Sequence, residues 1–222
     1  MDLYNKELTE KFGAIATEKQ AFFADIVGEM NWNVDMQQGE ILFGNDLAFP
    51  MQVLGTFSHS SETWLWAWAN SKSGIPEELL EQANELKSCG EKLKIEFLTE
   101  EEFEIERNDM HYIGLIALGM GGSNGYYLGN YGAGTMCLTI KSQELEDKFP
   151  NSHHSIFTVF PQLISEYDIN HKEAFVNYLS QKQYKMETNG NEIIGKSGKN
   201  TVKAIFDDLG RLAELSGDVE KD

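Results

Sequence analysis

The stretch that decides the fold is Thr63-Trp-Leu-Trp-Ala-Trp-Ala69. Side chains of a β-strand point alternately to its two faces, so Trp64, Trp66 and Trp68 would share one face and small apolar side chains the other. A strand that is apolar on both faces is typical of the covered interior of a sheet. This stretch therefore predicts a buried central strand.

A helix and three strands are predicted before this central strand. Apolar side chains recur at three- and four-residue spacing through the first thirty residues, which indicates an amphipathic helix with Glu18 on its water-facing side. Alternating patterns then predict strands over 32–36, 40–43 and 49–58, separated by turns rich in Gly, Asn and Asp. The first third of the chain is therefore a helix followed by a four-stranded antiparallel meander.

The middle of the chain predicts shorter elements. A helix opens near Ser73 and is expected to end at Gly90. Short strands are predicted over 93–98 and 103–106, and a helix runs from Asp109 to about residue 118.

A glycine-rich stretch, residues 119–134, comes next. It predicts a hairpin whose strands lie around 126–128 and 135–140, where glycine permits bulges and close backbone packing. A polar loop is expected over 141–150.

The last third predicts two helices and a second meander. The helices cover 155–166 and 171–181, and Pro161 is expected to kink or interrupt the first. The meander's strands are expected near residues 184–187, 192–194, 201–206 and 211–215, with Asn189-Gly190 as a hairpin turn. For the final piece we favour a strand over a helix that begins at Asp207.

These elements predict an α+β fold, in which antiparallel β-meanders are flanked by helices. We expect one domain over 1–222, with possible halves 1–110 and 111–222. Each half carries a helix, an aromatic-led strand, a turn and a Glu-Ile strand, at Glu40 and Glu192, so the halves could be a repeat. Of the two interpretations we favour chance similarity between amphipathic hairpins.

The charge excludes several classes of protein. The chain of 222 residues has 18 Lys and Arg against 36 Asp and Glu, a formal charge of −18. Nucleic-acid binding needs clustered basic side chains, and an anionic membrane surface would repel this chain. We therefore expect no nucleic acid and no membrane as partners. The chain also begins without a basic, apolar leader, and the acidity is typical of a soluble cytoplasmic protein.

Cofactor and metal motifs are missing from the sequence. Cys89 and Cys137 belong to no CxxC pair, and no HExxH or phosphate-binding loop is present. Gly119, Gly121 and Gly122 resemble the start of a dinucleotide motif, but Asn124 breaks it. His153 and His154 are expected in a solvated loop. We predict no cofactor and no metal, and no catalytic residue can be named.

One candidate ligand site remains, an aromatic pocket lined by Trp64, Trp66, Tyr126 and Tyr127. For the indoles we favour burial in the core over a role in such a pocket. Three buried indoles would contribute roughly 15 kcal/mol of gross hydrophobic stabilisation, which alone could explain their presence.

The motifs Leu54-Gly-Thr-Phe-Ser58, Thr63-Trp-Leu-Trp-Ala-Trp-Ala-Asn-Ser71 with Pro76, and Phe206-Asp-Asp-Leu-Gly-Arg-Leu212 resemble one bacterial family. That family is uncharacterised and is known only as a domain of unknown function. The resemblance implies a bacterial, cytosolic protein. It implies no activity, cofactor or site residue.

We therefore expect a non-enzymatic binding or interaction protein. Its specific form would be an acidic partner of a basic protein, as a toxin-neutralising immunity protein is, since acidity steers association with a basic surface. The alternative is a small-molecule-binding protein or an enzyme that uses the aromatic pocket.

Overall fold

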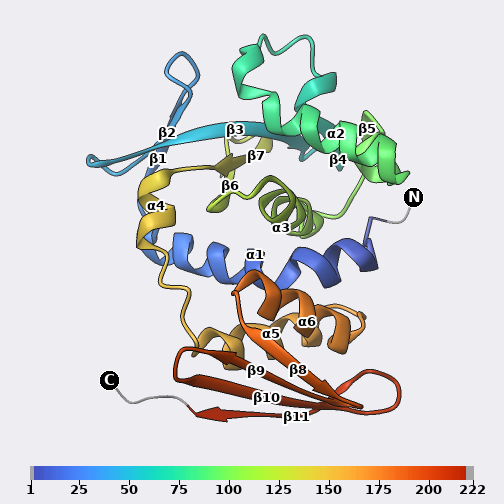
Figure 1. Ribbon diagram of the computed structural model, residues 1–222. Coiled ribbons are helices and arrows are strands. Elements are labelled where there is room, and N and C mark those ends of the chain that lie inside the picture. Colours follow the sequence, from blue (N-terminus) through green and yellow to red (C-terminus); the bar gives the residue numbers. More distant parts are fainter. Residues whose placement is uncertain (1–2, 219–222) are drawn as a thin grey trace. The chain divides into compact units, whose positions relative to one another are not determined.

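The computed structural model describes residues 3–218, which form two compact units (Figure 1). Among these residues, unit 1 holds residues 3–4 and 19–149, and unit 2 holds residues 5–18 and 150–218. Helix α1 (Lys6–Val27) confirms the long helix that the sequence predicts. One boundary between the two units falls inside this helix. The single domain with possible halves 1–110 and 111–222 stays a prediction.

Unit 1 contains a seven-stranded antiparallel sheet. Its strands are β1 (Trp32–Asp35), β2 (Glu40–Phe43), β3 (Leu47–Ser58), β4 (Thr63–Trp66), β5 (Glu102–Glu104), β6 (Gly125–Asn130) and β7 (Gly134–Ile140). Strands β1 to β5 are neighbours in chain order, which confirms the predicted first meander. The β6–β7 hairpin is confirmed as well, and β7 adds it to the sheet by pairing with β3.

Helices cover this sheet. They are α2 (Glu81–Leu93), α3 (Asp109–Gly121), α4 (Gln143–Lys148) and the later part of α1, with short 3₁₀ turns η1 (Ala67–Ala69), η2 (Glu77–Leu79) and η3 (Glu96–Leu98). Helix α2 packs on β3, and α3 packs on β6 and β7 (Figure 1). The core between these elements includes Phe23, Phe43, Phe49, Val53, Ala83 and Leu138.

The tryptophan-rich strand is shorter than predicted. It ends at Trp66, because the chain turns into η1, and Trp68 therefore does not continue the strand. Trp66 itself bonds to residues far along the chain: its indole donates to the carbonyl of Phe97 over 2.9 Å, and its backbone N–H donates to the carbonyl of Glu101.

Three other predictions for unit 1 are wrong. Gly90 lies inside α2, at a position where a side chain would collide with Leu98. The helix ends instead at Leu93, and the next residue, Lys94, takes the left-handed conformation. Residues 93–98 are not a strand, since Glu96–Leu98 form a 3₁₀ turn. Residues 141–150 include helix α4 in place of a continuous loop.

Unit 2 follows the prediction closely. Its helices are α5 (Ser155–Glu166) and α6 (His171–Gln181), and its sheet has β8 (Lys185–Asn189), β9 (Glu192–Ser197), β10 (Asn200–Phe206) and β11 (Leu212–Asp218) in the order β11-β10-β9-β8. The final piece is a strand, as favoured. Helix α5 continues through Pro161. Residues of α5 and α6 pack on one face of the sheet (Figure 1).

The predicted α+β class is confirmed: the described residues form six α-helices and eleven strands in two antiparallel sheets. The similarity of the two meanders stays a prediction. Within the described part of the chain, no helix combines the length and apolar character needed to cross a bilayer.

Candidate functional site

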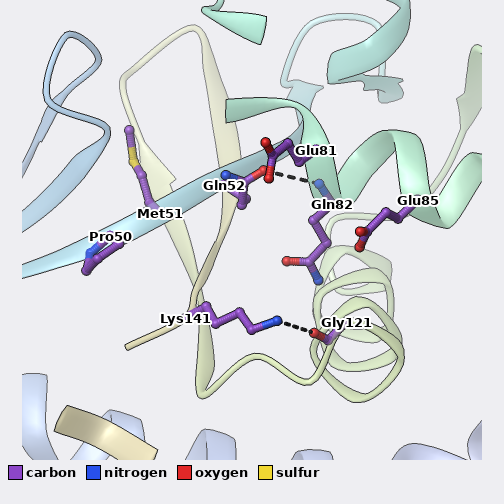
Figure 2. A pocket seen from close by; sticks show the side chains of 8 residues that line it. All are labelled: Pro50, Met51, Gln52, Glu81, Gln82, Glu85, Gly121 and Lys141. Atoms are coloured by element: carbon purple, nitrogen blue, oxygen red, sulfur yellow. Dashed lines mark hydrogen bonds between the residues drawn. The ribbon is translucent and has the colours of Figure 1, made fainter. Parts of the chain in front are cut away.

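A hollow of about 220 Å³ lies between the start of α2 and strand β3 in unit 1 (Figure 2). Helix α2 supplies Glu81, Gln82 and Glu85, which point toward the hollow from one side. Lys141, just after β7, reaches in from another side. The rest of the lining is Pro50, Met51, Gln52 and Gly121.

The side chain of Gln82 forms a fixed wall of this hollow. It is only 6% exposed. Its Nε2 donates to the carbonyl of Ala117 over 2.8 Å, and its Oε1 accepts from the hydroxyls of Ser123 at 3.1 Å and Thr139 at 2.5 Å. One buried carboxamide therefore joins α2 to α3 and β7.

Gly121 explains part of the glycine-rich stretch. A Cβ at this position would collide with the carboxamide of Gln82. The glycine therefore permits the close approach of the end of α3 to α2, as the close-packing interpretation expects.

The charged side chains of the hollow are exposed. Glu81 and Glu85 lie one helical turn apart, where like charges repel each other. Neither forms an ion pair with any side chain in residues 3–218. The Nζ of Lys141 lies 3.4 Å from the carbonyl oxygen of Gly121. The hollow thus presents two unneutralised carboxylates to solvent.

Two more hollows adjoin the first. One shares Gln82, Glu85 and Gly121 with it and adds apolar side chains such as Leu86 and Met120. The other shares Glu81 and adds Trp68 and further glutamates. We call the three together the α2 groove; from η2 and α2 its lining includes Glu77, Glu78, Glu81, Gln82, Asn84 and Glu85.

Three of the four aromatic residues predicted as a ligand site, Trp64, Trp66 and Tyr126, are buried. Trp64 and Trp66 are both 0% exposed, and their ring centroids lie 5.3 Å apart in an edge-to-face arrangement. The core interpretation of these two indoles is confirmed.

Of the two tyrosines, Tyr126 is 7% exposed and Tyr127 is half-buried. The Tyr126 hydroxyl is 2.9 Å from Nδ1 of His111. Tyr127 packs its ring on Trp32 and Phe43, and burial raises its pKa. Within the described chain, none of the four predicted residues is part of the α2 groove lining, and their role in ligand binding stays a prediction.

Unit 2 holds a buried ion pair that the sequence did not predict. Glu18 is 4% exposed and Lys182 is 2% exposed, and the Lys182 ammonium lies 2.8 Å from both carboxylate oxygens. The Tyr178 hydroxyl donates to Glu18 over 2.6 Å. Burial lowers the pKa of Lys182, and the hydrogen bond and charge of Glu18 act in the opposite direction. The pKa of Tyr178 is raised, mainly by burial and next by the charge of Glu18. The water-facing position predicted for Glu18 is wrong.

The solvated position predicted for His153 is also wrong. The side chain is 8% exposed, and its Nδ1 lies 2.6 Å from the Tyr184 hydroxyl. The imidazole stacks on the Tyr184 ring and meets Phe157 edge-on. His154 is exposed, as expected.

Several of these polar residues gave no signal in the sequence. Gln82 is a lone polar residue on a helix, and its three partners lie 35 to 57 positions away in the sequence. Glu18 and Lys182 are separated by 164 positions. In residues 3–218 no group of three or more His, Cys, Asp and Glu is arranged to hold a metal ion.

The fold and the groove define an acidic α+β protein with an unneutralised carboxylate surface. A family model, Family of unknown function (DUF6882), matches residues 6–143, and the chain belongs to this family. The resemblance to a family of unknown function is therefore confirmed, and the matched span contains the whole α2 groove. No curated protein and no solved structure matches the chain.

Proposed function

We propose that this protein is a non-enzymatic binding protein of the bacterial cytoplasm that holds a basic protein partner at the α2 groove. A toxin-neutralising immunity protein is the specific form of this proposal. The observation that carries it is that the groove lining has four carboxylates without an ion pair in residues 3–218, against the two basic side chains Lys92 and Lys141.

Residues 61–110 contain thirteen acidic and five basic side chains. None of the thirteen carboxylates forms an ion pair with a side chain in the described part of the chain, whereas acidic residues such as Glu146, Glu187 and Asp207 do. Four unpaired carboxylates line the α2 groove: Glu77, Glu78, Glu81 and Glu85.

Such a surface favours a basic partner for two reasons. The summed field of the carboxylates attracts positive charge over several ångströms and raises the association rate. Each Lys or Arg of the partner also relieves the mutual repulsion of neighbouring glutamates. The hollows give this surface a shape that protruding basic side chains can enter.

The test is to isolate a partner at low ionic strength and measure its association rate with the purified protein against NaCl concentration. We expect a partner rich in Lys and Arg and an association rate that falls as NaCl is added. A partner whose association rate does not depend on salt would overturn the proposal.

A charge-matched pair of variants locates the surface. The groove variant is Glu77→Gln/Glu78→Gln/Glu81→Gln, and the control is Asp25→Asn/Glu29→Gln/Asp46→Asn, which removes three exposed carboxylates elsewhere in unit 1. We expect the groove variant to slow association about tenfold at low salt and the control to slow it much less. Equal slowing would show that net charge, and not the groove, governs binding.

The second candidate is a small-molecule-binding protein or an enzyme that uses Trp64, Trp66, Tyr126 and Tyr127. The complete burial of the two indoles favours the first proposal. Tryptophan fluorescence measured against a panel of metabolites separates the two, because saturable quenching would favour the aromatic pocket.

A further inference from the structure

We propose that Trp68 and the glutamates beside it form a subsite for one arginine side chain of the basic partner, with Lys87 as an internal competitor for the same ring. This inference rests on the proposed function and names the group that the α2 groove would recognise.

The subsite is the third hollow of the groove, a space of about 610 Å³. Its lining combines Trp68 from turn η1 with Glu77 and Glu78 from turn η2 and Glu81 from the first turn of α2. All three carboxylates are exposed, and Trp68 is half-buried. An aromatic ring that shares a hollow with carboxylates is a combination that binds an organic cation.

An independent contact shows that the ring accepts a cation. The ammonium of Lys87 lies 3.9 Å from the centroid of the Trp68 ring. Among residues 3–218, no carboxylate forms an ion pair with Lys87. The buried indole Nε1 of Trp68 has no hydrogen-bond acceptor in that range either. Within residues 3–218, the cation–π contact with Trp68 is therefore the one electrostatic interaction that fixes the Lys87 ammonium.

A guanidinium fits this place better than an ammonium does. It is planar and weakly hydrated, so it stacks on an indole at low cost, and its fork of donors pairs with a carboxylate through two hydrogen bonds. Lys87 has a flexible four-carbon stem and can release its ammonium to water. An arriving arginine would gain both the ring and a glutamate, whereas Lys87 has the ring only.

The first experiment titrates the ¹⁵N-labelled full-length protein at low ionic strength with the peptide acetyl-Gly-Arg-Arg-Gly-amide. The indole resonance of Trp68, assigned with Trp68→Phe, reports on the subsite. The controls are two peptides in which both arginines are replaced, by lysine in one and by the neutral analogue citrulline in the other. We expect the Trp68 indole resonance to shift saturably with the arginine peptide, to shift less with the lysine peptide, and not to shift with the citrulline peptide. A silent Trp68 resonance during binding, or an equal shift with citrulline, would overturn the subsite.

The second experiment uses the competitor. Lys87→Met frees the ring, and Lys72→Met removes one exposed positive charge from the same segment without touching the groove. We expect Lys87→Met to raise the affinity for the arginine peptide roughly two- to fivefold more than Lys72→Met does, the value of one exposed cation–π contact. Equal affinities of the two variants for the arginine peptide would show that Lys87 does not compete for the Trp68 ring.

These outcomes separate the two proposals. If the partner binds in a salt-dependent way while the Trp68 resonance stays silent, the arginine subsite is wrong and the proposed function stands. If the partner associates independently of salt, the proposed function itself is wrong and the subsite falls with it.

Discussion

At the scale of single residues, Gln82 is the side chain on which the wall of the groove depends. Its carboxamide is the hydrogen-bond partner of one carbonyl and two hydroxyls that are themselves buried. A buried polar group that loses its partner costs more than the bond contributes, because the group has already lost its contact with water.

We therefore expect Gln82→Leu to destabilise the protein by about 2–4 kcal/mol, since it leaves the Ala117 carbonyl and the hydroxyls of Ser123 and Thr139 without this partner. Urea unfolding followed by circular dichroism measures the change. Gln38→Leu, at an exposed turn, is the control and should change stability by less than about 0.5 kcal/mol. Similar midpoints for both variants would show that the Gln82 network does not stabilise the fold.

His153 connects stability to pH. Burial lowers its pKa below the usual value, helped by the charges of Lys182 and His154, while the backbone of Asp218 acts in the opposite direction. The unfolded chain then binds a proton more readily than the folded chain, so stability falls as the pH drops below about 6.5 and through the lowered pKa.

We expect His153→Gln to flatten the loss of stability as the pH falls below about 6.5, and the exposed neighbour His154→Gln to reduce that slope much less, because the His154 charge is the smallest of the effects that lower the His153 pKa. Urea midpoints at a series of pH values measure both. A wild-type slope in the His153 variant would assign the pH dependence to other groups, such as His111 and His171, whose pKa values are also lowered by burial.

At the scale of elements, local periodicity was enough to predict much of the fold. Helices α5 and α6 follow the apolar spacing of their own residues, and the C-terminal hairpins are marked by Asn189-Gly190 and similar turns. The tryptophan strand shows where this reasoning stops. Residues 67–69 alternate like a strand, yet they form the turn η1, while Trp66 before them bonds to residues 97 and 101, which no local pattern indicates.

The candidate site was harder to predict than the elements. The aromatic residues are conspicuous in the sequence, but Trp64 and Trp66 are conspicuous because they fill the core. The groove is built by ordinary residues, Gln82 and the glutamates of α2, whose partners come from other elements. Their meaning depends on which elements become neighbours, and periodicity does not report that.

The buried pair Glu18–Lys182 links two helices of unit 2 and permits a prediction at this scale. Lys182→Met should destabilise the protein by about 3–5 kcal/mol, because it leaves the Glu18 carboxylate buried without its cation. Lys148→Met breaks the exposed pair with Glu144 and should cost less than about 1 kcal/mol.

A double variant, Glu18→Gln/Lys182→Met, should recover part of the loss, since no uncompensated charge remains. Urea unfolding of the four proteins measures these differences. Equal losses in the Lys148 and Lys182 single variants would show that the buried pair contributes no more than a surface pair.

At the scale of the whole molecule, the charge of −18 acts on folding and on binding in opposite ways. Folding brings like charges together, so self-repulsion destabilises the compact state, and added salt screens it. Binding to a basic partner draws opposite charges together, so the same salt weakens the attraction that steers association.

We therefore expect NaCl between about 10 and 500 mM to raise the Tm of the free protein while it lowers the association rate with the proposed basic partner. Calorimetry and stopped-flow kinetics on one preparation measure both. The groove variant Glu77→Gln/Glu78→Gln/Glu81→Gln should show a smaller effect of salt on each quantity, because fewer carboxylates repel each other and fewer attract the partner. A Tm that falls with NaCl would show that repulsion between the carboxylates does not destabilise the folded protein. The effects of salt on Tm and on association could then not be explained by the same excess of negative charge.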